Sequence, residues 1–416
     1  MSVDKRLLKE LFALLLSTLA AIIGWIIIAP ITFLIPKNKK RIVVIGRDGG
    51  KLLDNSKYFY IQAQALIAKD VQCTFVTEHS SVYQLLKQQQ LPALLYPSVK
   101  SIFYLATAKV VIVDSVDWQR RMRLFLTAGS KRIQLWHGVG FKRIELDKLN
   151  NEATSKRLMS SKWMLQLRLL LRFFTGRNAA YSLVNTTSKF YLEQVFEPAF
   201  TSPYFAALGY PRNALDGNPL YLLNTDSHIF TELKKWLTDN KKIILVSPTF
   251  RDTRETPMGI DAHTLEKINH WCEANNAVFV FKFHPCERGT DRVQSEYIYQ
   301  YQADKDIYPL FPYAYAMVSD YSSIYMDFLL LDKPVYFLVP DLEEYIAKDR
   351  QIQFDFNRMT PGPKVNNWDE LLQAILLEDA YKQEREKLRT LAYDNLQQAD
   401  STKKILQSCK NMQWIN

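Results

Sequence analysis

The chain has 416 residues, of which 48% are hydrophobic and 23% are charged. This composition fits a globular protein, and the length excludes a single ordinary core, so two domains after a short leader are expected. The four cysteines lack the paired spacing of a disulfide framework or a zinc site, which indicates reduced thiols in a cytosolic compartment.

The first predicted element is an apolar helix at the N-terminus. Residues 11–36 contain no charged side chain. At about 1.5 Å per residue, a helix of this length crosses a hydrocarbon core of roughly 30 Å. We therefore expect residues 1–36 to form a single-pass transmembrane anchor, with a cleaved signal peptide as the alternative. The basic cluster at 37–41 favours cytosolic catalytic domains at the inner, cytoplasmic membrane.

The charge is divided unevenly along the chain, whose net charge is +10. Residues 37–180 carry a net charge of +16, and residues 181–416 carry −7. The basic half predicts an anionic partner, which could be nucleic acid, an anionic membrane surface or a phosphorylated substrate. No nucleic-acid-binding module is recognisable, so nucleic acid is not expected as a partner.

Residues 156–177 form a predicted amphipathic helix. Trp163, Leu167 and Phe174 share one face, and Lys162 and Arg168 share the other. Two interpretations are equally supported: the helix packs on the core of the first domain, or it lies in an anionic membrane surface.

Short β-branched runs alternate with amphipathic stretches along both halves of the chain. The predicted strands are 41–46, 110–114, 132–136, 181–184, 242–246, 277–281, 316–319 and 334–338. Near-continuous apolar strands separated by helices predict an α/β fold with parallel sheets covered on both faces. Pro and Gly residues after 209–213 place the domain boundary there, giving domains 37–215 and 216–416. Residues 376–411 are expected to be helical.

Two histidines stand where predicted strands end. His137 is followed by Gly138, and His284 is followed by Pro285. Ligands of α/β proteins bind beyond the carboxyl ends of the strands, and Gly or Pro turns the chain there. Both histidines are therefore candidate catalytic residues in a cleft between two lobes, although a single histidine in such a place is more often structural.

Two further strand ends carry groups suited to phosphate. Thr249 and Arg251 follow the strand at 242–246, and a guanidinium makes bidentate contacts with phosphate. Asp320, Ser322 and Ser323 follow the strand at 316–319 and precede an apolar run. Serines in this position either bind phosphate with the helix amides or simply cap the helix.

Two other features have weaker functional interpretations. Asp304 and Asp306 have the composition of a metal-binding pair but fall in an expected loop, so no metal site is predicted. The stretch 46–50 contains three glycines that would let the backbone approach a ligand, but it is too irregular for a dinucleotide fingerprint.

Five motifs in order resemble the CDP-glycerol glycerophosphotransferase family of teichoic-acid primases and polymerases. They are Trp136-His137-Gly138 with Lys142, Gly209-Tyr210-Pro211-Arg212-Asn213, Ser247 to Asp252, His284-Pro285, and Asp320 to Ser323. The resemblance covers residues 40–365. It departs at Val139-Gly140-Phe141 and at Ala214, positions that bear on the identity of the acceptor.

The resemblance implies a GT-B fold, in which two Rossmann-like domains face a cleft. It further implies transfer of glycerol phosphate from CDP-glycerol to a hydroxyl of a lipid-linked or polymeric acceptor, with release of CMP, in teichoic-acid-like or capsular polymer synthesis. Residues 37–215 would face the acceptor and membrane, and residues 216–416 would bind CDP-glycerol. No further cofactor is expected.

The resemblance also distributes roles among the residues. His137 would be the general base, and His284, Arg251, Ser322 and Ser323 would hold the donor pyrophosphate. Thr249 and Asp320 would shape that donor site, while Gly138, Lys142 and Arg212 would lie at the acceptor or in the cleft. The alternatives are a ribitol-phosphate transferase, a GT-B glycosyltransferase that uses a nucleotide sugar, and a non-catalytic membrane-anchored binding protein.

Overall fold

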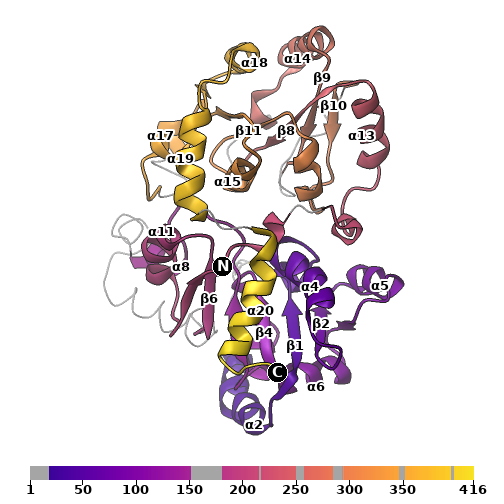
Figure 1. The fold of residues 1–416 in the computed structure, drawn as a ribbon, viewed down its shortest axis with the longest axis vertical. Helices are drawn as coiled ribbons and strands as arrows, with labels where there is room; N and C mark the ends of the chain where they lie inside the picture. The colour runs from indigo at the N-terminus through magenta and orange to yellow at the C-terminus, as the bar shows by residue number, and fades with distance from the viewer. Residues whose placement is uncertain are drawn as a thin grey trace, which may run out of the picture. The chain divides into compact units, whose positions relative to one another are not determined.

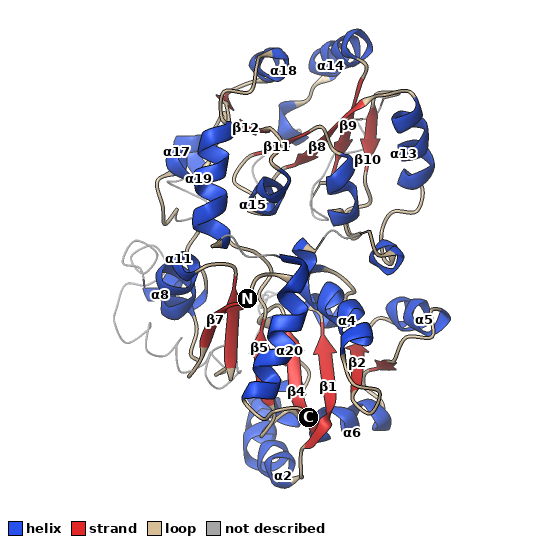
Figure 2. Cartoon of the chain, viewed as in Figure 1, coloured by secondary structure: helices blue, strands red, loops and turns tan. Residues whose placement is uncertain are grey.

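A computed structural model describes residues 18–150, 180–214, 217–249, 257–283, 293, 295–345, 352–394 and 398–416. The chain forms two compact units (Figures 1 and 2). The first comprises residues 1–137, 144–214 and 396–416, and the second comprises residues 138–143 and 215–395. The chain therefore passes from one unit to the other four times.

Within the described residues, the first unit contains a parallel sheet of seven strands in the order β3-β2-β1-β4-β5-β6-β7. The strands are β1 (Asn38–Ile45), β2 (Gln72–Thr77), β3 (Ala93–Leu95), β4 (Ala108–Val113), β5 (Lys131–Gln134), β6 (Leu183–Thr186) and β7 (Phe205–Ala207). The central strands β1 and β4 are almost wholly apolar where they pair, because helices cover both faces of a parallel sheet.

The helical segments of the first unit are mostly short. They are η1 (Gly24–Ile28), α2 (Ala29–Leu34), α3 (Arg47–Gly50), α4 (Asp54–Leu66), α5 (Ser80–Gln88), α6 (Val99–Thr107), η2 (Asp117–Gln119), α7 (Arg123–Leu126), α8 (Glu145–Asn150), α11 (Lys189–Tyr191), η3 (Leu192–Phe196), α12 (Glu197–Ala199), η4 (Pro211–Asn213), η11 (Gln398–Asp400) and α20 (Ser401–Asn411). The last two return from the far end of the sequence. Thr402 donates to Gln62 on α4, and the amide of Tyr210 donates to Gln398 Oε1 at 3.1 Å.

The second unit contains a parallel sheet whose described strands follow the order β10-β9-β8-β11-β12-β13. They are β8 (Lys242–Ser247), β9 (Ala277–Phe281), β10 (Ile298–Gln300), β11 (Ala316–Ser319), β12 (Val335–Leu338) and β13 (Lys364–Val365). Its helical segments are η5 (Pro219–Leu222), α13 (Ile229–Thr238), η6 (Pro257–Gly259), α14 (Ala262–Asn275), η8 (Tyr308–Tyr313), α15 (Ile324–Phe328), η9 (Leu329–Leu331), α16 (Leu342–Glu344), α17 (Phe356–Met359), α18 (Trp368–Leu376) and α19 (Lys382–Tyr393).

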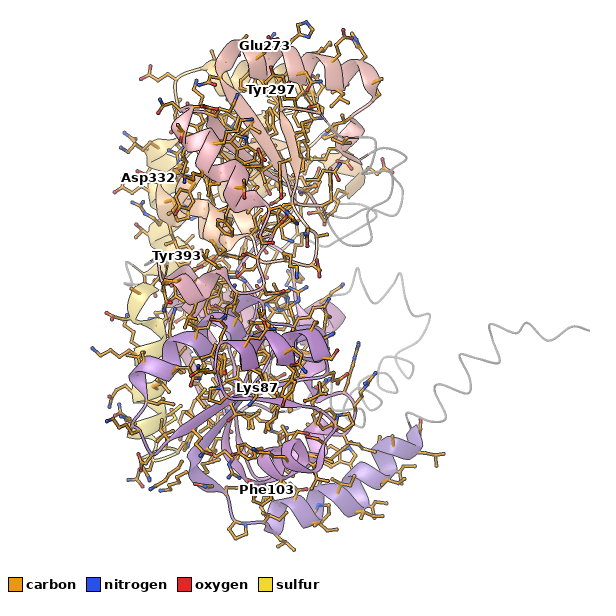
Figure 3. All side chains as sticks on the ribbon, turned by 90° about the vertical axis from the view of Figure 1, so that its right-hand side faces the viewer. Lys87, Phe103, Glu273, Tyr297, Asp332 and Tyr393 are labelled. Carbon is orange, nitrogen blue, oxygen red and sulfur yellow. The ribbon has the colours of Figure 1, made fainter. Side chains whose placement is uncertain are left out.

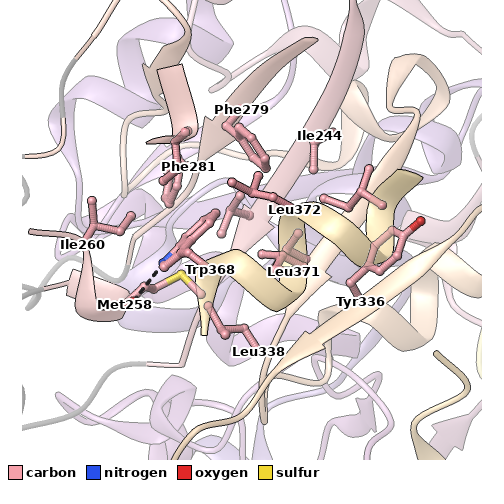
Figure 4. Packing of buried hydrophobic residues seen from close by; sticks show 14 of the residues in the cluster. Ile244, Met258, Ile260, Phe279, Phe281, Tyr336, Leu338, Trp368, Leu371 and Leu372 are labelled. Carbon is pink, nitrogen blue, oxygen red and sulfur yellow. Dashed lines mark hydrogen bonds between the residues drawn. The ribbon is translucent and has the colours of Figure 1, made fainter. Parts of the chain in front are cut away.

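The core of the second unit is built around a tryptophan on α18. Trp368 packs against Phe279 and Phe281 of β9, and its indole N–H donates to the carbonyl oxygen of Met258 at 3.1 Å (Figure 4). Burying a tryptophan this way keeps its polar atom satisfied while the ring fills the space between helix and sheet. The same buried cluster includes Val246 of β8 and Val318 of β11, two strands whose carboxyl ends carry predicted donor-site residues.

The α/β class with parallel sheets is confirmed, but the predicted membrane-spanning helix is wrong. Residues 18–34 are helical, and within the described residues no helix combines the length and apolar composition needed to cross a membrane. One side of this helix packs on the first unit: Gly24 and Trp25 contact Phe125, and Thr32 is buried. The predicted localisation as a single-pass protein of the inner membrane is therefore wrong as well. Figure 3 shows the helix along one end of the first unit, the end that also carries Phe103.

Candidate active site

Three neighbouring strands of the first unit deliver polar groups to one edge of its sheet. Arg47 follows β1, Asp114 follows β4, and His137 follows β5. Because these strands are parallel and adjacent, their carboxyl ends meet at the same edge. The apolar strands thus bring together three residues that lie far apart in the sequence.

The backbone at His137 is held in an unusual conformation. Trp136 has a φ of 59°, and Gly138 has a φ of 144°. A left-handed aromatic residue costs on the order of 1–3 kcal/mol and persists only where its surroundings fix it. Asn55 Nδ2 donates to the carbonyl oxygen of Trp136 at 2.9 Å, and the Trp136 ring packs on the His137 ring at 4.2 Å between centroids. These contacts fix the orientation of the His137 imidazole at the end of the strand.

The tautomer of His137 follows from one hydrogen bond. Nδ1 of His137 lies 2.9 Å from the carbonyl oxygen of Asp114, which can only accept, so Nδ1 carries the proton. Nε2 then bears a lone pair. Burial, and next the charge of Arg47, lower the pKa of His137 to about 4, so the ring is neutral near pH 7. A neutral imidazole with a defined lone pair is suited to accept a proton.

A mostly buried carboxylate, that of Asp54, connects two arginines to this histidine. Arg212 Nη1 donates to Asp54 Oδ1 at 2.5 Å and to the carbonyl oxygen of His137 at 2.9 Å. Arg47 Nη1 donates to Asp54 Oδ2 at 2.8 Å. Burial alone would raise the pKa of Asp54, but Arg47 and Arg212 lower it to about 2. Arg212 is thus placed where it supports the His137 backbone, and its predicted contact with the acceptor stays a prediction.

Asp114 is a candidate residue that the motif search missed. Its side chain is buried, and its Oδ2 accepts from the amide of Ser56 at 2.9 Å. Burial, followed by the charge of Asp54, raises the pKa of this carboxyl to about 7. The strand-end rule that selected His137 applies equally to Asp114, which ends the apolar run of β4, so the signal was present in the sequence.

In the second unit, Asp320 organises the predicted donor-site turn. This buried carboxylate accepts from the Thr249 amide at 2.8 Å, from the Thr249 hydroxyl at 2.8 Å and from the Tyr321 and Ser322 amides at 2.6 and 3.2 Å. It therefore ties the end of β8 to the end of β11. Ser323 occupies the N-cap position of α15, yet its side chain makes no capping hydrogen bond, so capping does not account for it.

The segment that follows His137 belongs to the second unit. Phe141 packs against Tyr325 and Phe356, and its carbonyl oxygen accepts from the amide of Gln353 at 2.6 Å. The ammonium of Lys142 lies 5.3 Å from the centre of the Tyr345 ring. Gly140 leaves no room for a side chain, because a Cβ there would lie 2.9 Å from the Cβ of Ser323. Lys142 and Ser323, both predicted site residues, thus lie in one unit.

Other predicted residues are placed elsewhere. Arg251, His284 and the amphipathic helix at 156–177 lie outside the described residues. Asp306 is buried, and its carboxylate accepts from the Tyr308 amide at 3.1 Å at the start of η8, which gives it a structural role. In the part of the chain that is described, no group of three or more His, Cys, Asp or Glu side chains is arranged to hold a metal ion.

The curated relatives are teichoic-acid enzymes. The chain is 27% identical over 329 residues to the teichoic acid poly(glycerol phosphate) polymerase of Bacillus spizizenii, a match that covers 74% of this chain and 76% of that protein. It is also 27% identical over 267 residues to the teichoic acid ribitol-phosphate polymerase TarK of Staphylococcus aureus, where the match covers 59% of this chain and 46% of that protein.

A solved structure shares the fold of this chain, and a family model matches most of its length. A structure of the wall teichoic acid polymerase TagF is similar in fold, with a TM-score of 0.67 and 18% identity over 95% of this chain and 96% of that chain. The model of the CDP-glycerol:poly(glycerophosphate) glycerophosphotransferase family matches residues 27–408. The predicted family and enzyme class are therefore confirmed, and the chain belongs to the CDP-glycerol:poly(glycerophosphate) glycerophosphotransferase family.

Proposed function

We propose that this chain transfers glycerol phosphate from CDP-glycerol to a hydroxyl group of a lipid-linked or polymeric acceptor in the synthesis of a teichoic-acid-like surface polymer. The observation that carries this proposal is the hydrogen bond between His137 Nδ1 and the Asp114 carbonyl oxygen, which leaves Nε2 as a proton acceptor at the sheet edge. Family membership supplies the donor.

The reaction is a displacement at the glycerol-bearing phosphorus. Nε2 of His137 removes the proton of the acceptor hydroxyl, and the oxygen attacks that phosphorus. The bond from phosphorus to the bridging oxygen of CMP breaks, and CMP leaves with the electron pair. A positioned base of this kind contributes about 10²–10⁴-fold to the rate. Most of the remaining catalysis of phosphoryl transfer comes from positioning and electrostatic stabilisation.

The donor pyrophosphate would be held by the second unit. The Asp320 carboxylate orders the turn that carries Ser322 and Ser323, whose hydroxyls would donate to phosphate oxygens. Arg251 and His284 complete this set through the resemblance to the family. We propose no cofactor beyond the CDP-glycerol substrate.

Ribitol-phosphate transfer is the second candidate, because a ribitol-phosphate polymerase is among the curated relatives. The test measures CMP release by the purified full chain from CDP-glycerol and CDP-ribitol, and UDP release from a UDP-sugar, each with a glycerol-phosphate-ended acceptor. We expect CDP-glycerol to give the highest kcat/KM. A preference for CDP-ribitol would establish the second candidate, and UDP release alone would reject both.

We also propose that the protein binds at an anionic membrane surface, where a lipid-linked acceptor would be found. The helix at 18–34 presents apolar side chains to solvent: Ile26 is 70% exposed, and Leu34 is 80% exposed. Lys39 and Lys40 follow closely and are also exposed. An apolar face next to lysines is suited to lie in the headgroup region without crossing the bilayer.

Vesicle flotation tests this surface. We expect the wild-type chain to float with anionic vesicles at low salt, and the triple variant Ile26→Ser, Ile31→Ser, Phe33→Ser to bind them at least tenfold more weakly. The matched control is Leu237→Ser, an exposed leucine of the second unit. Equal binding by the triple variant and the wild type would exclude this helix as the membrane-binding surface.

A further inference from the structure

The loop after β1 places an arginine in the network that supports His137. Arg47 Nη1 lies 2.8 Å from Asp54 Oδ2, while Arg212 Nη1 lies 2.5 Å from Asp54 Oδ1 and 2.9 Å from the carbonyl oxygen of His137. A continuous path of three hydrogen bonds therefore joins the Arg47 guanidinium to the proposed base. All four residues belong to the first unit.

The positive charge in this network is accessible at one residue. Asp54 is hydrogen-bonded to both guanidinium groups, and a second carboxylate oxygen, Asp48 Oδ2, lies 3.9 Å from Arg47 Nε and 3.2 Å from the Lys51 ammonium. The side chain of Arg212 is only 3% exposed, whereas that of Arg47 is 39% exposed. Within the described residues, Nη2 of Arg47 has no hydrogen-bond partner. A guanidinium with one edge anchored and the other open is suited to bind a phosphate oxygen.

The backbone that carries Arg47 is fixed by several contacts. Asp48, Gly49 and Gly50 all have positive φ, at 49°, 80° and 95°. The amide of Lys51 donates to the carbonyl oxygen of Arg47 at 2.9 Å. The amide of Glu78 donates to the carbonyl oxygen of Gly49 at 2.7 Å. The glycines thus let the chain reverse tightly after β1, and the guanidinium is held in place before a ligand arrives.

We propose that Arg47 binds the phosphate adjacent to the accepting hydroxyl, so that the enzyme selects acceptors that end in glycerol phosphate. This inference rests on the proposed function and deepens it. The family description already includes a poly(glycerophosphate) acceptor, whereas the residue that would recognise its last phosphate lies in a loop with no role so far.

The proposed contact has a consequence for the base. When His137 accepts a proton, it becomes a cation in the field of Arg47, which opposes that step. A phosphate bound to Arg47 neutralises the field, so the imidazole becomes a better proton acceptor when a phosphate-bearing acceptor is in place. The lowering of the His137 pKa by Arg47, second to burial, agrees with this coupling.

The experiment compares two alkyl-linked acceptors, one ending in glycerol phosphate and one ending in glycerol, with CDP-glycerol as donor. For Arg47→Gln we expect the ratio of kcat/KM for the phosphate-ended acceptor to kcat/KM for the glycerol-ended acceptor to fall at least tenfold. The KM for CDP-glycerol should stay within twofold. Arg47→Lys should retain part of the preference for the phosphate-ended acceptor. A lysine keeps the positive charge but lacks the two parallel N–H donors of the guanidinium group.

Lys51→Gln is the matched control, since it removes one positive charge from the same loop at a residue that pairs with Asp48 rather than Asp54. Its preference between the two acceptors should equal that of the wild type. An equal loss on both acceptors in Arg47→Gln, with an unchanged thermal midpoint, would refute the role of Arg47 while leaving the proposed function intact. A wild-type chain that releases no CMP from CDP-glycerol with either acceptor would refute both.

Discussion

Nδ1 of His137 lies 2.9 Å from the carbonyl oxygen of Asp114, the residue that directly follows the neighbouring strand β4. Because a backbone carbonyl cannot donate, this contact selects the tautomer with the proton on Nδ1. It does so without placing a negatively charged group beside the ring. The hydrogen bond itself raises the pKa of His137, but burial and next the charge of Arg47 outweigh it and lower the pKa to about 4. The consequence is a base that stays unprotonated in mildly acidic solution.

The first prediction concerns pH. With a folded-state pKa of about 4, His137 remains neutral as pH falls through its ordinary value of about 6.5. The acidic limb of kcat/KM should therefore lie below pH 6.5. The profile should be measured in CMP release at saturating donor. An acidic limb centred at or above pH 6.5 would contradict the low pKa of the free enzyme's base.

Removal of the imidazole is the second prediction. His137→Ala should lower turnover by at least about 10²-fold with an unchanged thermal midpoint, because the group lost is a general base. We expect the same of His284→Ala from the resemblance to the family. His270→Ala, an exposed histidine on α14, is the control and should retain wild-type turnover. Turnover near that of the wild type in His137→Ala would remove its proposed role.

The third prediction concerns the buried ion pair. Asp54→Asn leaves the Arg212 guanidinium buried without its carboxylate, which should lower the free energy of unfolding by about 3–5 kcal/mol. Urea unfolding measures this change. Asp70→Asn breaks the exposed pair with Lys40 and should lower the free energy of unfolding clearly less. If the two substitutions lower the free energy of unfolding equally, the pair of Asp54 with Arg212 stabilises the fold no more than the exposed pair does.

The same pair gives a pH dependence of stability. The pKa of Asp54 is about 2 in the folded chain and about 3.9 when unfolded. Its contribution is therefore present above pH 3.9 and is lost as pH falls toward 2. Asp54→Asn should flatten the dependence of unfolding free energy on pH in that window only.

The donor-site turn yields the fourth prediction. Asp320→Asn places an amide N–H group where several donors converge on a carboxylate, so the ends of β8 and β11 should separate. CDP-glycerol should bind at least tenfold more weakly by calorimetry, and Ser322→Ala with Ser323→Ala should also weaken it. Asp304→Asn, an exposed position, is the control. Unchanged donor affinity in both variants would place the donor site elsewhere.

A glycine in the Arg47 loop is the basis of the fifth prediction. A Cβ at Gly50 would lie 2.6 Å from the Val76 carbonyl oxygen, and φ there is 95°. Gly50→Ala should therefore reduce the free energy of unfolding by about 1–3 kcal/mol. Gly217 also has a positive φ, of 76°, but open space around it, so Gly217→Ala should cost clearly less in the same urea experiment.

Apolar runs in the sequence predicted the principal strands, because strands buried on both faces need near-continuous apolar side chains. The run at 110–114 corresponds to β4, and that at 277–281 corresponds to β9. Short strands at the sheet edges, such as β3 and β13, were missed since two or three residues carry no pattern. The predicted helix at 376–411 is two helices, interrupted after Tyr393 where Asp394 is left-handed.

The prediction that the N-terminal helix spans a membrane was wrong, because hydropathy counts apolar residues but does not show which of them pack on the rest of the protein. Thr32 and Gly24 are buried against the first unit, while Ile26 is open to solvent. The strand-end rule located His137 but was not applied to Asp114. The pairing of Asp54 with two arginines could not be predicted, because it joins the starts of α3, α4 and η4 through tertiary packing alone.

The return of α20 to the first unit has a consequence for biosynthesis. A ribosome delivers the chain from its N-terminus, and domains usually fold as they emerge. Here the hydrogen bonds of Gln62 with Thr402 and of Tyr210 with Gln398 cannot form early. Thr402 and Gln398 are synthesised only after the second unit. The second unit can therefore mature during translation, whereas the first closes only near the end. The part of α4 that α20 later covers is the surface that nascent-chain chaperones would meet longest.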